Sequence, residues 1–121
     1  MSDGTWSDEQ VHLWLQDVAD AGWVSLHYDS PILGGLDRAE ISGGGYKRIR
    51  VSFSQPSNRI IWSLTDARFT GLVQTQLTHF GIWSDESLGM LRASGLLPTK
   101  VIILNGKGFV IPAGELALSI G

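Results

Sequence analysis

Residues 40–48 read Glu-Ile-Ser-Gly-Gly-Gly-Tyr-Lys-Arg, and this stretch decides how the chain around it is interpreted. Three consecutive glycines free the backbone from the steric limits that a Cβ atom imposes. The residues that follow, 46–53, alternate polar and apolar side chains, which is the pattern of a strand with one buried face. We therefore predict a glycine-rich loop over residues 31–45 that leads into a β-strand.

The alternation also predicts which side chains of that strand are buried. Successive side chains of a strand point to opposite faces of the sheet. Ile49, Val51 and Phe53 then share the apolar face, while Arg48 and Arg50 share the opposite face. We expect both arginines to lie in solvent.

The N-terminal segment, residues 1–22, carries the helical pattern. Ser7 and Gln10 have the spacing of a capping box, in which each side chain satisfies a backbone N–H of the other. Apolar side chains then recur every three or four residues, at Val11, Trp14, Leu15 and Val18. This predicts one amphipathic helix over roughly residues 7–20, ending near Gly22.

The remainder of the chain reads as short strands separated by turn residues. We expect strands at residues 23–28, 46–53, 60–64, 77–83, 90–97, 101–104, 109–111 and 116–120, with Pro98 ending one of them. Since no helical pattern separates the later strands, we expect antiparallel pairing in place of a parallel α/β sheet. The sequence predicts a mainly β protein, an antiparallel β-sandwich of about seven or eight strands with one N-terminal α-helix.

The apolar positions of these elements predict the core. We expect it to contain Ile49, Val51, Phe53, Phe80, Ile82, Ile103, Leu116 and Leu118. Four tryptophans, Trp14, Trp23, Trp62 and Trp83, are expected to pack in it as well, because large aromatic side chains stabilise a small core most. The alternative is that exposed tryptophans form a platform for stacking sugars. Trp6 lies outside the helical stripe and is expected at the surface.

Length and composition set the class of protein. With 121 residues, 43% of them hydrophobic and 17% charged, the chain is expected to fold as a single domain over residues 1–121. It contains no cysteine, so neither disulfides nor thiolate metal sites are available. The acidic N-terminus and the lack of a long apolar run predict neither a signal peptide nor membrane insertion.

The charges are unevenly distributed along the chain. Residues 1–40 contain eight acidic residues and one arginine, a net charge of −7, whereas residues 41–121 contain eight basic and four acidic residues, a net charge of +4. Either each charge is solvated on its own surface, or the two regions attract each other between neighbouring subunits. The net charge of −3 and the absence of a nucleic-acid-binding motif argue against a nucleic-acid partner.

No constellation of residues in the sequence indicates catalysis. The three histidines, His12, His27 and His79, lack a second ligand at metal-binding spacing. His79 lies in a predicted strand and is expected to be a hydrogen-bonded structural residue. There is no nucleophile elbow, phosphate-binding loop or dinucleotide fingerprint. We expect no catalytic residue, no metal and no cofactor.

The glycine stretch and residues 78–83, Thr-His-Phe-Gly-Ile-Trp, together resemble the two signature segments of a family of tailed-phage virion proteins. Members of this tail-fibre or minor-tail type are small β-sandwiches. The order of further segments is similar, from the N-terminal helix and the Tyr-Asp-Ser-Pro turn at residues 28–31 to the Asn-Gly turn at residues 105–106.

The resemblance implies a structural virion protein, made in the host cytoplasm and found in the tail more readily than in the capsid. Its partners would be other virion proteins and further copies of itself, joined by protein contacts. The alternatives are a capsid decoration protein and a carbohydrate-binding module that contacts host-surface glycans. The residues expected at the interface are Trp6, Gly43, Gly44, Gly45, Tyr46, Arg48 and Arg50.

Overall fold

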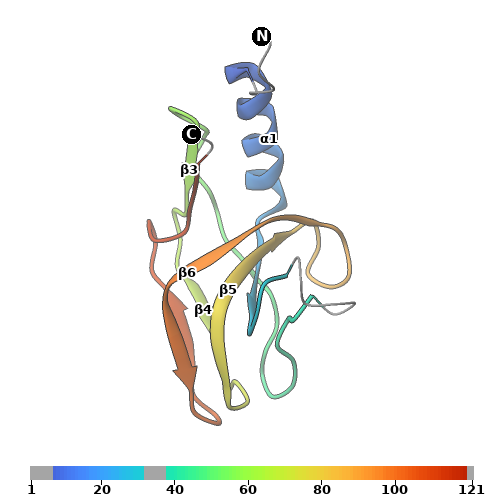
Figure 1. Ribbon diagram of the computed structural model, residues 1–121, viewed down its shortest axis with the longest axis vertical. Coiled ribbons are helices and arrows are strands. Elements are labelled where there is room, and N and C mark those ends of the chain that lie inside the picture. Colours follow the sequence, from blue (N-terminus) through green and yellow to red (C-terminus); the bar gives the residue numbers. More distant parts are fainter. Residues whose placement is uncertain (1–6, 32–37, 120–121) are drawn as a thin grey trace.

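The described part of the chain, residues 7–31 and 38–119 of a computed structural model, contains one helix followed by eight strands (Figure 1). The elements are α1 (Asp8–Ala21), β1 (Trp23–His27), β2 (Ile49–Arg50), β3 (Ile60–Trp62), β4 (Ala67–Phe69), β5 (Thr75–Trp83), β6 (Leu91–Ile103), β7 (Phe109–Ile111) and β8 (Ala117–Ser119). None of its helices is long and apolar enough to cross a membrane.

The strands form one larger sheet and two small ones, all antiparallel. The larger sheet has the order β2-β1-β5-β6, and β3 pairs with β8 and β4 with β7 in two-stranded sheets. Side chains from all three sheets and from α1 meet in one hydrophobic cluster. The expected antiparallel β-sandwich with one N-terminal helix is confirmed.

Local interactions fix both ends of α1. Ser7 Oγ accepts a hydrogen bond from the backbone N–H of Gln10, and the Gln10 side chain accepts one from the Ser7 N–H, so the expected capping box is present. Gly22 ends the helix in the left-handed region at φ 69°, as helix C-caps commonly do. The buried face of the helix is formed by Val11, Leu15 and Val18.

The expected core is confirmed for five residues, and the other three lie at its edge. Buried are Val51, Phe80, Ile82, Ile103 and Leu116. Ile49, Phe53 and Leu118 are half-buried and pack against the same cluster. The strand expected over residues 46–53 is shorter than predicted, because only Ile49–Arg50 pairs regularly, with β1, and Phe53 makes one isolated bridge to Ser63.

The expectation that Pro98 ends a strand was wrong. Residues 90–97 and 101–104 were predicted as two strands, but β6 runs from Leu91 to Ile103 without a break. Its pairing with β5 shifts where Leu77 is opposite Val101 and His79 is opposite Leu96, so that a bulge accommodates the proline. β6 is at the edge of the larger sheet, where a missing proline N–H interrupts no second ladder.

Candidate functional site

The glycine stretch is fixed against the chain's own backbone. Gly43 and Gly44 have φ values of 88° and 55°, in the left-handed region that favours glycine. The Gly45 N–H donates to the carbonyl of Gly71 at 2.8 Å. A Cβ at Gly44 would lie 2.4 Å from the same carbonyl oxygen, and a Cβ at Gly45 would lie 2.8 Å from the oxygen of Thr70. Glycine is therefore required here for close approach of two backbone segments.

Arg48 lies at the centre of the region that follows the glycines. Its side chain was expected in solvent, which was wrong: residue 48 is only 7% exposed. The guanidinium donates from Nε and Nη2 to the two carboxylate oxygens of Glu40, at 3.0 and 2.8 Å. It also stacks on the Trp83 ring, 3.7 Å from the ring centroid. Burial of a guanidinium is tolerated because its donors are paired in this planar arrangement.

The same arginine connects this region to the loop between β5 and β6. Arg48 Nη1 donates to the backbone carbonyls of Asp85 and Leu88, at 3.1 and 2.7 Å. Ser84 closes the loop, since its N–H donates to the Met90 carbonyl at 3.0 Å and its Oγ accepts from the Met90 N–H at 2.9 Å. We call residues 40–48 and 84–90 together the Arg48 surface.

Tyr46 is a further hydrogen-bond partner of the Glu40 carboxylate. Its hydroxyl donates to Glu40 Oε2 and accepts from the Leu26 N–H at 3.2 Å. Burial, together with the adjacent Glu40 carboxylate, raises the pKa of the Tyr46 hydroxyl well above its usual value. The tyrosine therefore stays protonated and acts as a hydrogen-bond donor.

A series of buried hydrogen bonds runs from the Trp83 side chain through Ser25 to His27. The Trp83 indole N–H donates to Ser25 Oγ at 2.8 Å, and Ser25 Oγ is 2.6 Å from His27 Nε2. His27 Nδ1 is 2.7 Å from the Arg38 carbonyl, which can only accept, so Nδ1 carries the proton and Nε2 accepts from Ser25. Burial lowers the pKa of His27, which favours this neutral form. A Cβ at Gly81 would lie 2.6 Å from Ser25 Oγ, so this position needs glycine.

A short Ser–His contact is also the arrangement by which hydrolases activate a nucleophile. Here Ser25 and His27 are both fully buried, and their side-chain hydrogen-bonding atoms are engaged within the protein. The pair consequently joins β1 to Trp83 and to residue 38. Within the described ranges, no group of three or more metal-ligating side chains comes together.

The residues expected at an interface do not all meet. Gly43, Gly44, Gly45, Tyr46 and Arg48 belong to the Arg48 surface. Arg50 is exposed, as expected, but lies at the end of α1, where its Nη2 donates to the Asp20 carbonyl at 3.3 Å and its guanidinium lies 5.7 Å from the Trp23 ring centroid. Trp6 is outside the described residues.

The sequence predicts a turn between the strands at residues 77–83 and 90–97, but not its contact with Arg48, and it does not predict the role of His27. Two adjoining grooves, of about 490 and 520 Å³, are both lined by residues 40–42 and by Leu88. The spacing of Ser25 and His27 could have indicated their contact, because side chains two residues apart on a strand point to the same face. His79, which attracted attention instead, is half-buried, and its Nδ1 lies 2.7 Å from Thr78 Oγ1.

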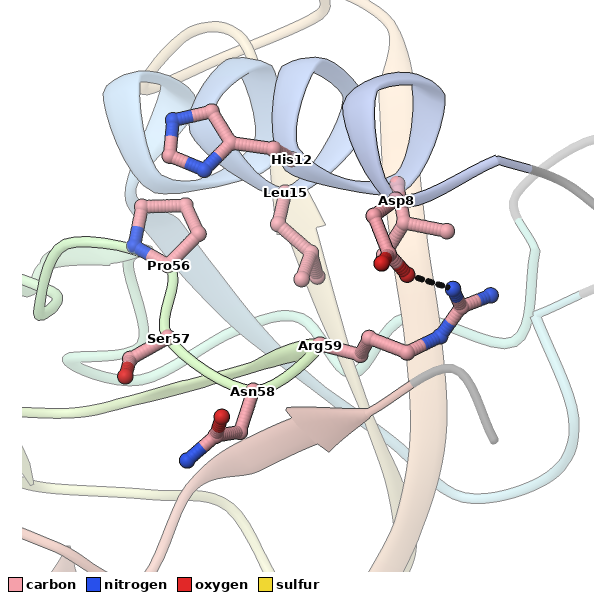
Figure 2. A pocket seen from close by; sticks show the side chains of 8 residues that line it. Asp8, His12, Leu15, Pro56, Ser57, Asn58 and Arg59 are labelled. Carbon is pink, nitrogen blue, oxygen red and sulfur yellow. Dashed lines mark hydrogen bonds and ion pairs between the residues drawn. The ribbon is translucent and has the colours of Figure 1, made fainter.

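A third groove, of about 430 Å³, lies between α1 and the turn before β3 (Figure 2). Asn58 and Arg59 form this turn with φ values of 52° and 64°, and Arg59 pairs with Asp8 across the groove. His12 and Pro56 line it further along the helix.

The tryptophans differ in their burial. Trp83 is buried, while Trp14 and Trp23 are half-buried. Trp62 was expected in the core, which was wrong: it is 37% exposed on β3. The alternation of that strand explains the difference, because Ile61 takes the buried face and its neighbour must point outward.

Comparison with known proteins identifies the family to which the chain belongs. The sequence matches the family described as Podophage GP4 fiber I protein gp80 over residues 18–119, which includes all eight strands and leaves most of α1 outside the match. No curated protein matches the chain. Because the match covers most of the sequence, and because the mainly β fold agrees with the expected sandwich, the chain belongs to this family of phage fibre proteins.

Proposed function

We propose that this chain is a non-enzymatic structural subunit of a podophage tail fibre that assembles through protein contacts, with the Arg48 surface as a contact region. Family membership supports the fibre role. The observation that carries the contact region is the bracing of two loops by one buried side chain, Arg48, while the outer part of those loops stays open to solvent.

The physical reasoning concerns the cost of ordering a loop on binding. A loop that is mobile before it binds loses conformational entropy when a partner fixes it, and a loop that is already held does not. Four hydrogen bonds from Arg48 hold residues 40–48 and 84–90 together before any partner arrives. The surface is therefore preorganised, and modest contacts repeated by symmetry would be enough for assembly.

The test is the association state of the purified chain, alone and mixed with the other fibre chains of the same phage. We expect self-association or a complex, measured by light scattering after size-exclusion chromatography. Lys47→Glu reverses an exposed charge on the Arg48 surface and should weaken the association, whereas Arg50→Glu, at the end of α1, is the matched control. A monomer that binds none of those chains would contradict the proposal.

Glycan contact at the host surface is a second candidate, and the half-exposed Trp62 is the observation that favours it. Aromatic faces stack on sugar rings in many carbohydrate-binding sites. The test is binding of the purified chain to host-envelope polysaccharide, with Trp62→Ala compared with the wild type. Equal binding by both proteins, or none by either, would exclude Trp62 as a sugar platform.

A further inference from the structure

The tip of the 84–90 loop presents an apolar side chain in a strained backbone. Leu88 is 85% exposed and has a φ of 56°, in the left-handed region. Side chains with a Cβ adopt this region at a cost in free energy that glycine does not incur. Since most of the Leu88 side chain touches nothing in its own chain, side-chain contacts within the protein do not offset that cost. A strained and exposed residue of this kind points to a role outside the chain.

The position of Leu88 is nevertheless well fixed. Its carbonyl accepts from Arg48 Nη1 at 2.7 Å, and the loop is closed by the two hydrogen bonds between Ser84 and Met90. The next residue, Gly89, has a φ of 74°, and a Cβ there would lie 2.7 Å from Ser84 Oγ. The loop therefore holds Leu88 as a preformed apolar knob.

A matching hollow lies between β6 and β7. It has a volume of about 150 Å³, and its apolar lining includes Leu97, Val101, Phe109 and Ile111. A dry cavity of roughly this size lined by Leu, Ile and Phe can hold a benzene molecule, so the four carbons of a leucine side chain fit within it. We call this hollow the β6–β7 groove.

The knob and the groove face different sides of the molecule. In Figure 1 the loop that joins β5 to β6 is at the right, while the lower half of β6, together with the strand that follows it, is at the left. A knob on one side and a groove on the other cannot meet within one chain. They can meet between copies that are arranged head to tail, which is a heterologous contact.

The charges beside the two surfaces are complementary. Asp85 and Glu86 are exposed in the same loop as Leu88, and Lys100 is exposed on β6 between Thr99 and Val101, which line the groove. The signs are also present the other way round, because Lys47 lines the groove beside Leu88 and Glu115 lines the β6–β7 groove. Each side thus offers both signs, so one relative orientation is favoured over others.

We propose that Leu88 of one copy inserts into the β6–β7 groove of a second copy, so that copies of this chain join head to tail. This inference rests on the proposed role as an assembling fibre subunit and names the surfaces involved. The contact is directional, and the second copy leaves its own Leu88 free to bind a third.

Because the chain contains no cysteine, single cysteines can test the contact without background. Leu88→Cys is mixed with Thr99→Cys, a change at the rim of the groove, and treated with a short bifunctional thiol reagent. We expect a cross-linked dimer that contains one of each variant. Leu88→Cys mixed with Leu13→Cys is the matched control, because Leu13 is 62% exposed on α1 and should give none.

Leu88→Ala tests the affinity and should weaken self-association about tenfold or more, as removal of a central apolar anchor does. Leu13→Ala removes another largely exposed leucine and should change nothing. Cross-linking only between two copies of residue 88, or none in a chain that self-associates, would overturn the head-to-tail contact. A monomer that still binds other fibre chains would overturn this inference alone, whereas a monomer that binds none would overturn the proposed function as well.

Discussion

Replacement of Arg48 by alanine is expected to destabilise the protein more than any other loss of a single charge in the described residues. The change removes four hydrogen bonds and the stacking on Trp83. It leaves the Glu40 carboxylate, with a side chain only 16% exposed, without its cation. Breaking a buried ion pair from one side costs about 3 to 5 kcal/mol, a large part of the 5 to 15 kcal/mol by which a typical domain is stable.

The matched control is Arg68→Ala. Arg68 pairs with Asp66 at 3.1 Å, but its side chain is 68% exposed and that of Asp66 is 39% exposed. An exposed pair contributes about 0 to 1 kcal/mol, because water solvates both charges after the pair is broken. The two variants therefore make the same chemical change in a buried and an exposed position.

The assay is urea unfolding followed by tryptophan fluorescence, with amide hydrogen exchange read at residues 84–90. We expect Arg48→Ala to lower the free energy of unfolding by about 3 kcal/mol or more and to speed exchange in that loop, while Arg68→Ala does neither. A loss below about 1 kcal/mol, or unchanged exchange at residues 84–90, would show that Arg48 does not brace the loop and would remove the basis of the Arg48 surface.

Three further outcomes are expected. Gly44→Val should lower the free energy of unfolding by at least about 2 kcal/mol, because it combines a positive φ with a clash against the backbone. Gly106→Val, at φ 82° with nothing within 4 Å of the added Cβ, should lower it less, and equal losses in urea melts would contradict the steric argument. Phe80→Ala, at a site 4% exposed, should cost about 3 to 5 kcal/mol in the same melts, and a loss below about 1 kcal/mol would place Phe80 outside the core. Stability in urea melts should fall as the pH drops below about 6.5, because the lowered pKa of His27 means that the unfolded chain binds a proton more readily; His27→Gln should flatten this slope between about pH 5 and 7, and an unchanged slope would contradict the role given to His27.

The parts of the fold that the sequence predicts well are those that local interactions decide. The capping box at Ser7 and the left-handed Gly22 involve residues within one helical turn, so their spacing in the sequence is already their geometry. The alternation of β5 likewise placed Phe80 and Ile82 in the core. In each case the pattern depends on neighbours along the chain, which the sequence displays directly.

The error at Arg48 arises because a distant segment covers a surface. Alternation assigned Arg48 to a solvent-exposed face together with Arg50. Arg48 is instead buried, because the loop at residues 84–90, almost forty residues further along the chain, packs against its side chain. Periodicity shows that a strand has two faces, but it cannot show whether a loop buries the second one.

Part of the uneven charge along the chain is neutralised by ion pairs within one molecule. In residues 7–31 and 38–119, three ion pairs join an acidic residue of the first 40 positions to a basic residue of the rest, namely Asp8–Arg59, Asp17–Arg92 and Glu40–Arg48. Each pair removes one charge from either side, so the formal charges of −7 and +4 fall to −4 and +1. Attraction between neighbouring copies is correspondingly weaker than the sequence alone implies. The proposed head-to-tail assembly would then depend more on an apolar anchor such as Leu88, which salt does not screen, than on the overall charge polarity of the chain.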